Sequence, residues 1–437
     1  MYNLSKYSII TENENKLLLY STLSRELLTL PLSYREFLKP FKSEEFSNSE
    51  IEHLLLKQFL YTDKEFDVLQ EYKEHQLKIE SDVYEIQITP SANCQLGCDY
   101  CGQSHTNERF EEALDDKLIA YIEKKIKTTK CKTLIVQWYG GEPLTSIYAI
   151  ERLSNKIIEL CQNNGIGYTS NIVTNGLLLS LRNFQKLLDL KIVEYQITID
   201  GDKEEHDNRR FFKNKKGSFD KIYNNVKAIC ENKFVTELEY NLNIRCNIDK
   251  RNALALWRLM DLFEKDKIQD KINLYIKAVH NWENDASLLC LSVDEFAKFE
   301  IDFLSRKILK NYKNYTALLP PRMYTTCMAT SNGTMELIDI KGNIFNCNEM
   351  PFIERLEKFA LGNIKSEEIK KDKYGLDNWF EKVEKREHSN CIDCSLLPVC
   401  GGYCPKHWID GNKNVCPSIK HNIKEVIELK YLISQKD

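Results

Sequence analysis

Three cysteines near residue 100 have the type and spacing of a metal site. Cys94, Cys98 and Cys101 are separated by three and by two residues. Three thiolates at this spacing can wrap one corner of a cube-shaped [4Fe–4S] cluster and leave its fourth iron open. An open coordination position is typical of a catalytic metal centre. Taken alone, the segment is also compatible with a zinc site of three cysteines or with a loop of unrelated thiols.

A second field of cysteines lies near the C-terminus. Cys327 and Cys347 are separated by fourteen residues, Gly342 and four more residues. A C-x2-C-x5-C-x3-C block and one last cysteine follow: Cys391, Cys394, Cys400, Cys404 and Cys416. A zinc ribbon is the alternative, because C-x2-C pairs often hold zinc. We expect the five remaining cysteines to be small buried residues: Cys131, Cys161, Cys230, Cys246 and Cys290.

Glycines and polar residues follow the predicted strands in four segments. They are Gly140, Gly141, Glu142, Pro143, Thr174, Asn175, Thr198, Asp200, Arg210 and Arg245. The glycines allow the backbone to approach a ligand closely. Each segment taken singly is compatible with a plain turn. Four such segments in register with four strands favour a binding site.

The elements that must position these residues alternate between strand and helix. Strand-like runs are predicted at 84–89, 133–138, 168–174, 193–199, 239–247 and 273–279, and helices between them at 118–127, 149–163, 181–190 and 219–232. This alternation implies βαβ units and a parallel sheet. We therefore predict an α/β fold with a partial (βα)6 barrel, whose active site lies at the carboxyl ends of the strands.

The chain divides into three predicted domains, at 1–82, 83–285 and 286–437. In the first, strands at 7–11, 17–20 and 26–30 precede helices at 34–41, 49–59 and 63–77, which suggests a winged-helix-like module. Ser49 and Glu52 give a start signal for the second helix. In the third, helices at 293–311 and 419–433 flank a poorly periodic core, where metal sites are expected to replace a hydrophobic core.

Composition narrows the class of protein. Hydrophobic residues make up 42% and charged residues 29% of 437 residues, an ordinary globular balance, and the formal net charge is -4. A nucleic-acid-binding protein would show a basic excess, so we expect no nucleic-acid partner. No run of 18 apolar residues and no apolar signal region occur, so we predict a cytoplasmic location, no membrane partner and reduced cysteines.

The first triad, with Tyr100 before its last cysteine, resembles the radical S-adenosylmethionine (SAM) superfamily, as do the four strand-end segments. This resemblance implies that the open iron chelates SAM and that electron transfer, from a donor such as flavodoxin or ferredoxin, yields a 5′-deoxyadenosyl radical. That radical abstracts hydrogen from the substrate. By the same resemblance, Glu142 accepts hydrogen bonds from the SAM ammonium group, and the other strand-end residues contact its ribose and carboxylate.

The C-terminal field resembles the SPASM domain of peptide-modifying radical SAM enzymes in the order and spacing of its cysteines. The resemblance implies two auxiliary [4Fe–4S] clusters, three clusters in all. The ligands would be Cys391, Cys394, Cys400 and Cys416 for the outer cluster, and Cys327, Cys347 and Cys404 for the inner one. Some members carry an eighth cysteine six residues before the first, where this chain has Pro321. Our hypothesis is that the inner cluster keeps an open iron that binds a substrate thiolate.

These resemblances imply an oxidoreductase that cross-links a ribosomally made precursor peptide, by a thioether in preference to a carbon–carbon bond. The N-terminal pattern resembles modules that bind the leader of such a peptide as an added strand; a structural cap on the barrel is the alternative. An anaerobic sulfatase-maturing enzyme that forms formylglycine is the second function, and a non-catalytic iron–sulfur carrier the third. No acid–base residue stands out, and His206 and His280 are expected to be surface or satisfied histidines.

Overall fold

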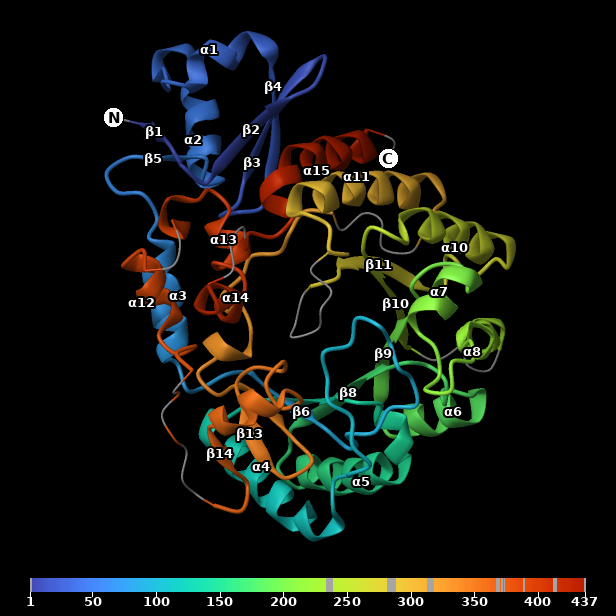
Figure 1. The fold of residues 1–437 in the computed structure, drawn as a ribbon. Coiled ribbons are helices and arrows are strands. Elements are labelled where there is room, and N and C mark those ends of the chain that lie inside the picture. The colour runs from blue at the N-terminus through green and yellow to red at the C-terminus, as the bar shows by residue number, and fades with distance from the viewer. Residues whose placement is uncertain are drawn as a thin grey trace.

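The protein is described by a computed structural model that covers residues 2–232, 239–280, 288–312, 318–366, 370, 372, 374–387, 390–411 and 415–435. A curved central sheet with helices on its outer side forms the largest part, and a small unit from the N-terminus lies apart from it (Figure 1). Among the described helices, none has the length and apolar character needed to cross a membrane.

The central sheet has nine strands in the order β11-β10-β9-β8-β7-β6-β12-β13-β14, and neighbours from β6 to β11 pair in parallel. These six strands are β6 (Val83–Ile88), β7 (Thr133–Trp138), β8 (Gly167–Thr174), β9 (Ile192–Thr198), β10 (Asn241–Ile248) and β11 (Asn273–Ala278). The helices among and after them are α4 (Asp115–Thr129), α5 (Ile147–Asn163), α6 (Leu181–Asp189), α7 (Lys203–Arg209), α8 (Phe219–Glu231), α10 (Ala253–Lys265) and α11 (Val293–Leu309). The predicted parallel α/β sheet is confirmed.

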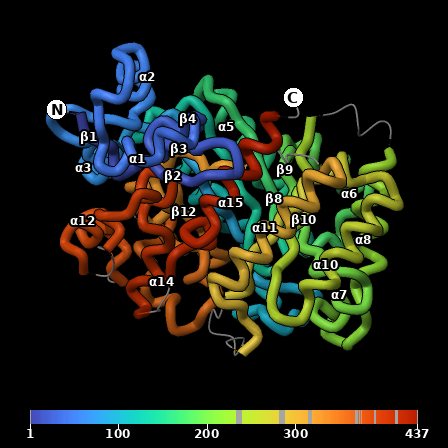
Figure 2. Tube along the Cα trace, turned by 90° about the horizontal axis from the view of Figure 1, so that it is seen from above, coloured from blue at the N-terminus to red at the C-terminus, as the bar shows by residue number. Residues whose placement is uncertain are grey.

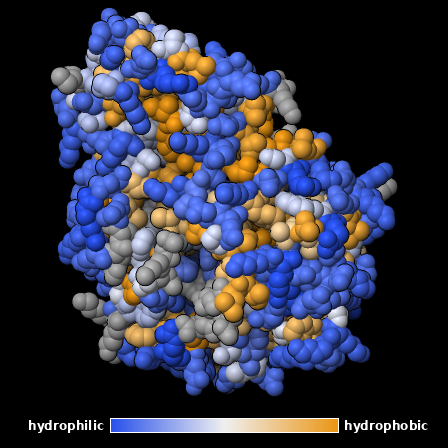
Figure 3. Space-filling model, turned by 45° about the horizontal axis from the view of Figure 1, so that its top comes forward, coloured by the Kyte–Doolittle hydropathy of each residue, from blue (hydrophilic) through white to orange (hydrophobic). Residues whose placement is uncertain are grey.

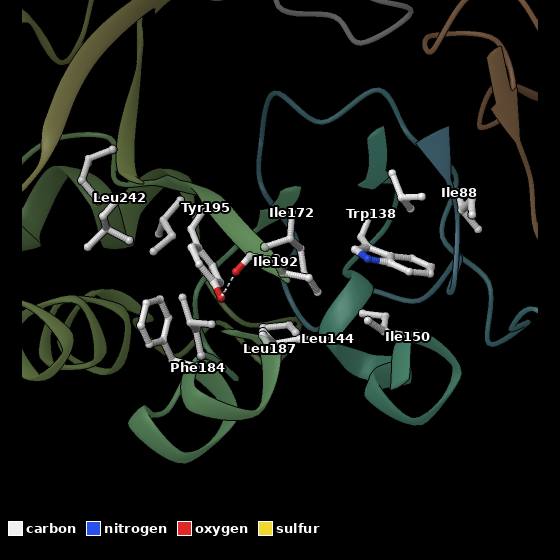
Figure 4. Packing of buried hydrophobic residues seen from close by; sticks show 14 of the residues in the cluster. Ile88, Trp138, Leu144, Ile150, Ile172, Phe184, Leu187, Ile192, Tyr195 and Leu242 are labelled. Carbon is white, nitrogen blue, oxygen red and sulfur yellow. Dashed lines mark hydrogen bonds between the residues drawn. The ribbon is translucent and has the colours of Figure 1, made fainter. Parts of the chain in front are cut away.

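Alternating burial explains why this sequence folds as a helix-covered sheet. In β7 every second residue is buried, which matches the period of a strand. Trp138 ends that strand and lies against Ile150 of α5, while Phe184 of α6 packs on Tyr195 of β9 (Figure 4). Tyr195 donates its hydroxyl hydrogen to the carbonyl of Ile192, at 2.6 Å. Each such buried apolar side chain contributes roughly 1.5–3 kcal/mol, so this layer fixes the strands that carry the site.

The C-terminal region continues the sheet. Its strands are β12 (Met335–Ile338), which pairs in parallel with β6, and β13 (Asn343–Phe345) and β14 (Gly362–Asn363), which pair antiparallel. Its helices are α12 (Trp379–Glu384), α13 (Leu397–Cys400), α14 (Pro405–Ile409) and α15 (Ile419–Ser434). Leu337, Phe345 and Leu356 belong to an apolar cluster of this region. The region therefore has an apolar core of its own, and metal sites here stay a prediction.

Helix α11 lies beyond the predicted boundary at 285 but packs with the central sheet. Phe296 and Phe303 join the main hydrophobic core, and the Lys307 ammonium donates to the carbonyl of Leu274 on β11, at 2.8 Å. The helix thus follows β11 as α10 follows β10. The six strands are each followed by helix, as the (βα)6 pattern predicts.

The N-terminal unit contains the three predicted strands, which form an antiparallel sheet in the order β2-β3-β4. Its elements are β1 (Asn3–Leu4), β2 (Ser8–Glu12), β3 (Lys16–Ser21), β4 (Leu27–Pro31), α1 (Arg35–Leu38), α2 (Asn48–Leu56), β5 (Leu60–Tyr61) and α3 (Val68–Leu77). The predicted start at Ser49 is wrong, because Ser47 caps α2 in a reciprocal hydrogen-bonded pair with Glu50. Helix α1 is shorter than predicted because Pro40 disfavours helix in the residue before it.

This N-terminal unit rests on the C-terminal region. Strand β2 contacts α15, and α15 in turn contacts α11, as Figures 1 and 2 both show. Tyr72 of α3 donates to the carbonyl of Leu397 at 2.8 Å, and Thr22 donates to the carbonyl of Ser395 at 2.7 Å. The unit therefore lies against the 391–400 cysteine block. On the face in Figure 3 the surface is mainly hydrophilic, with separate apolar patches.

Candidate functional site

A cavity of about 250 Å³ opens at the carboxyl ends of the parallel strands, where such folds place their active sites. We call it the strand-end cavity. Its lining includes eight of the predicted cofactor-binding residues, namely Tyr100, Gly140, Gly141, Thr174, Asn175, Thr198, Arg210 and Arg245, and all three cysteines of the first triad. Glu142, Pro143 and Asp200 are buried beside it and are not part of the lining. The structure thus brings the triad and most of the strand ends together.

The loop that carries the triad follows β6 and is held by the segment after α7. Gly97 donates its backbone N–H to the carbonyl of Phe211 at 2.9 Å, and Asp99 donates to that of Arg209 at 3.0 Å. Burial raises the pKa of Cys98 to about 12 and also raises that of Cys94. A bound cation reverses this preference, because a coordinating thiol loses its proton. The loop therefore presents thiols that a positively charged cluster would ionise.

Glu142 is buried behind the cavity wall and holds the wall residues Thr174 and Asn175 by hydrogen bonds. Its carboxylate accepts hydrogen bonds from the Thr174 hydroxyl at 2.6 Å, the Asn175 backbone N–H at 2.6 Å and the Leu144 N–H at 3.0 Å. Burial raises the pKa of this carboxyl group. Glu142 is fully buried and absent from the cavity lining, so in this structure its carboxylate faces these three donors and the contact with a SAM ammonium group stays a prediction.

The two glycines before Glu142 are needed for close packing within the chain. Gly140 has φ +91°, and a Cβ there would lie 2.1 Å from the ring of Phe352. Gly141 has φ +55°, and a Cβ would lie 2.7 Å from the carbonyl oxygen of Ser91. Both positions thus require glycine for steric reasons. Pro143 begins the short 3-10 helix that follows.

A buried polar network underlies one side of the cavity. The Tyr100 hydroxyl donates to the carboxylate of Asp200 and accepts hydrogen bonds from Arg210 and from the Asn247 side chain. Burial acts to raise the pKa of Asp200, but the charges of Arg209 and Arg210, the Tyr100 hydrogen bond and His206 together outweigh it, so the pKa is lowered. In this structure Asp200 therefore anchors Tyr100 from beside the cavity.

Two arginines make the cavity suitable for an anionic group. Arg210 lines it, and its Nε atom is buried without a hydrogen-bond partner among the described residues. Arg245 lines it too, with its Nε donating to the Asn247 side chain at 2.7 Å. Buried donors are normally satisfied, and guanidinium groups pair well with carboxylates. The residues present thus fit the carboxylate of an amino-acid moiety such as that of SAM.

The C-terminal cysteines form two groups. Cys391, Cys394, Cys400 and Cys416, the outer cysteines, line one small cavity with Lys420, whose ammonium lies 3.0 Å from the Cys394 sulfur. Cys327, Cys347 and Cys404, the inner cysteines, lie close enough that the charges of the other two raise the pKa of Cys347, although burial is the main cause. The two groups are those the SPASM resemblance implies.

Six of the ten predicted cluster cysteines accept a hydrogen bond from a backbone N–H. In each case the donor is the residue two positions later in the chain. The six are Cys94, Cys101, Cys327, Cys347, Cys400 and Cys404. Such donors stabilise metal-bound thiolates and tune cluster potentials. Burial also raises the pKa of Cys161 and Cys230, to about 12, but no backbone N–H of the described residues acts to lower it again. Four of the five remaining cysteines are buried as predicted, and Cys290 is half-buried.

Sequence reasoning missed several lining residues. Gln196 lies two positions from the predicted Thr198 on the same strand, so period-two alternation could have found it. Glu349 also lines the cavity and lies two residues after Cys347, at the inner cysteines. His280 lines it as well, and gave no sequence signal. His206 is a satisfied histidine as predicted, but buried: it accepts from the Asp200 N–H at 3.2 Å.

Comparisons with known proteins agree with this geometry. Residues 88–244 match the sequence model of the Radical SAM superfamily. The radical SAM cyclopropyl synthase TigE of Paramaledivibacter caminithermalis is 24% identical over 385 residues, 77% of this chain and 72% of that protein. A serine-type anaerobic sulfatase-maturating enzyme of Bacteroides thetaiotaomicron is 23% identical over 366 residues, 76% of this chain and 85% of that protein. The crystal structure of Streptococcus suis SuiB bound to precursor peptide SuiA has a TM-score of 0.53 and 17% identity, and covers 96% of this chain and 99% of that one.

Proposed function

We propose that this chain, a radical SAM enzyme, cross-links a ribosomally made precursor peptide. The observation that carries the proposal is the strand-end cavity, which joins the first cysteine triad to Glu349 beside the inner cysteines. A substrate held there lies between the place where a radical would form and a second metal site. When bound, the first cluster and SAM supply a 5′-deoxyadenosyl radical that abstracts hydrogen from the substrate.

The residues around that cavity have separate roles in this proposal. Cys94, Cys98 and Cys101 hold the first cluster. Arg210 and Arg245 bind the SAM carboxylate, while Thr198 and Asn175 contact the rest of SAM from the strand ends. Glu142 keeps Thr174 and Asn175 in place, and the Tyr100–Asp200 pair keeps Arg210 in place.

We assign two auxiliary [4Fe–4S] clusters to the outer and inner cysteines. Two observations support a metal centre at these cysteines. The outer cysteines surround a small cavity, and backbone N–H groups are directed at the sulfurs of four of the seven C-terminal cysteines.

A thioether is the favoured product because of the inner cysteines. They supply three protein thiolates, and Pro321 occupies the position of an eighth cysteine. An inner cluster with three cysteine ligands keeps one iron free to bind a substrate thiolate. The carbon–carbon cross-link is the second product, since it begins with the same hydrogen abstraction.

The N-terminal unit is proposed to bind the leader of the precursor. SuiB, which was crystallised with its precursor peptide SuiA, shares a fold with 96% of this chain. The remaining 4% is shorter than residues 1–82, so the shared fold includes most of that unit. Because the unit packs on the 391–400 block, deleting it would disturb the outer cysteines, and single surface substitutions test leader binding better.

The experiment uses anaerobically reconstituted enzyme, SAM, a reductant and synthetic copies of the short peptides encoded beside its gene. The proposal predicts 5′-deoxyadenosine and a peptide product two mass units lighter. A Cys94→Ala, Cys98→Ala, Cys101→Ala variant serves as the control without a first cluster. If none of these peptides is altered but a sulfatase-derived Cys or Ser peptide gains formylglycine, the sulfatase-maturing function is correct, which the 23% identity to the Bacteroides enzyme favours.

A further inference from the structure

Three cavities meet at one side chain, His280, which follows β11. It lines the strand-end cavity. It also lines a cavity of about 420 Å³ beside Cys327 and Cys404, and another of about 420 Å³ beside the start of α11. We call these the cysteine cavity and the α11 cavity. Tyr403 and His407 line both of them. The three cavities are therefore neighbours, with His280 in the wall of each.

The aromatic rings of His280, Tyr403 and His407 lie together where these cavities meet, and we call them the ring wall. The His280 and His407 rings have centroids 5.3 Å apart and planes at 65°, an edge-to-face arrangement. The Tyr403 and His407 rings are 6.3 Å apart with planes at 14°. Such pairs hold each other in fixed orientations. The wall joins the end of β11 to helix α14, so it connects the sheet with the cysteine-rich region.

The backbone at Tyr403 is strained in a way that places its ring on this wall. Gly401, Gly402 and Tyr403 have φ values of +62°, +89° and +64° in succession. The left-handed region is unfavourable for tyrosine, at a cost on the order of 1–3 kcal/mol, and such strain is concentrated at functional sites. The glycines are also confined, since a Cβ at Gly401 would lie 2.9 Å from the Thr326 side chain.

We propose that Tyr403, His407 and His280 position the substrate peptide, holding the residue to be modified at the mouth of the strand-end cavity. The peptide enters as an extended chain through the α11 cavity. Apolar groups such as Val293, Phe296 and Val415 line that entrance together with the charged Lys277 and Glu300. This mixture suits a peptide, which offers apolar side chains and backbone amides in alternation. The inference rests on the proposed function and names the residues that orient its substrate.

The test compares His280→Leu, His407→Leu and Tyr403→Asn with wild type. Asparagine tolerates the left-handed backbone, so Tyr403→Asn removes the ring without adding strain. We expect the KM for the precursor peptide to rise at least tenfold. We also expect more 5′-deoxyadenosine per modified peptide, because a loosely held substrate lets the radical react elsewhere. SAM affinity and iron content should stay at wild-type values, Tyr403→Phe should restore peptide KM, and His53→Leu on the exposed surface of α2 should have no effect.

The outcomes distinguish a failure of the ring wall's positioning role from a failure of the proposed function. If wild type modifies a peptide and the three variants retain its KM and its coupling, the ring wall has no positioning role and the inference is overturned. If one variant loses iron, it is left out, and the affinity of the two remaining variants for fluorescently labelled precursor peptide is measured against wild type. If wild type modifies none of the peptides encoded beside its gene, the proposed function falls, and the inference falls with it.

Discussion

Replacing Glu142 with glutamine tests whether this residue supports the cavity or contacts its ligand. The glutamine amide keeps one acceptor oxygen, which can serve Thr174 and Leu144, but turns an NH2 group toward the Asn175 N–H, which lies 2.6 Å from the present carboxylate. Losing this hydrogen bond leaves the buried Asn175 N–H without an acceptor, which costs about 1–3 kcal/mol in all. We therefore expect E142Q to destabilise the sheet domain by about 2 kcal/mol.

The assay is calorimetric unfolding of reconstituted enzyme without SAM, beside anaerobic titration of SAM. At about 2–4 °C per kcal/mol for a domain of this size, the melting temperature should fall by roughly 4–8 °C. SAM affinity should fall too, because Asn175 lines the cavity and would shift. Glu111→Gln, on an exposed carboxylate of the same domain, is the matched control. An unchanged melting temperature with SAM affinity reduced tenfold or more would refute this reasoning and restore the contact predicted from sequence.

Two further predictions concern charge. Burial lowers the pKa of Lys307 to about 8, so between pH 8 and 10.5 the unfolded chain binds more protons, and stability rises with pH across that window. Below pH 8 the buried charge of Lys307 destabilises the fold by a constant amount, about 3 kcal/mol. Lys307→Met should therefore raise the melting temperature at pH 7 and remove the increase in stability above pH 8. Lys298→Met on the same helix should have neither effect. Lys39 and Lys424 line a groove of about 430 Å³ beside β2. If the leader is acidic and binds there, Lys39→Glu with Lys424→Glu should raise peptide KM at least fivefold without changing SAM affinity, and Lys64→Glu outside the groove should not; equal KM values would exclude this groove.

Local patterns predicted the strands and the gathering of their ends. The six parallel strands follow from short apolar runs separated by helical periodicity, and the 133–138 prediction coincides with β7. Once the strands are parallel, their carboxyl ends must meet at one edge. That is why strand-end residues as distant as Thr174 and Arg245 could be assigned to one site, whereas Tyr100 was assigned through the family resemblance.

Non-local contacts set the limits of that prediction. The pairing of β12 with β6 joins segments about 250 residues apart, and no periodicity in either announces it. The inward turn of Glu142 depends on three donors from the chain around it, which a Gly-Gly-Glu-Pro motif does not reveal. The left-handed Tyr403 was equally hidden, because tyrosine rarely adopts that conformation. Boundaries shifted where a neighbouring residue offered a better cap, as Ser47 does for α2.

Counting iron, sulfide and zinc in the anaerobically reconstituted protein tests the central claim, which is three [4Fe–4S] clusters around a peptide-modifying site. The account predicts roughly twelve irons and twelve sulfides per chain and no zinc, and about eight of each in a variant with Cys391→Ala and Cys394→Ala. About four irons accompanied by bound zinc would contradict it, because the first triad alone would then hold a cluster and the C-terminal cysteines would form a zinc module.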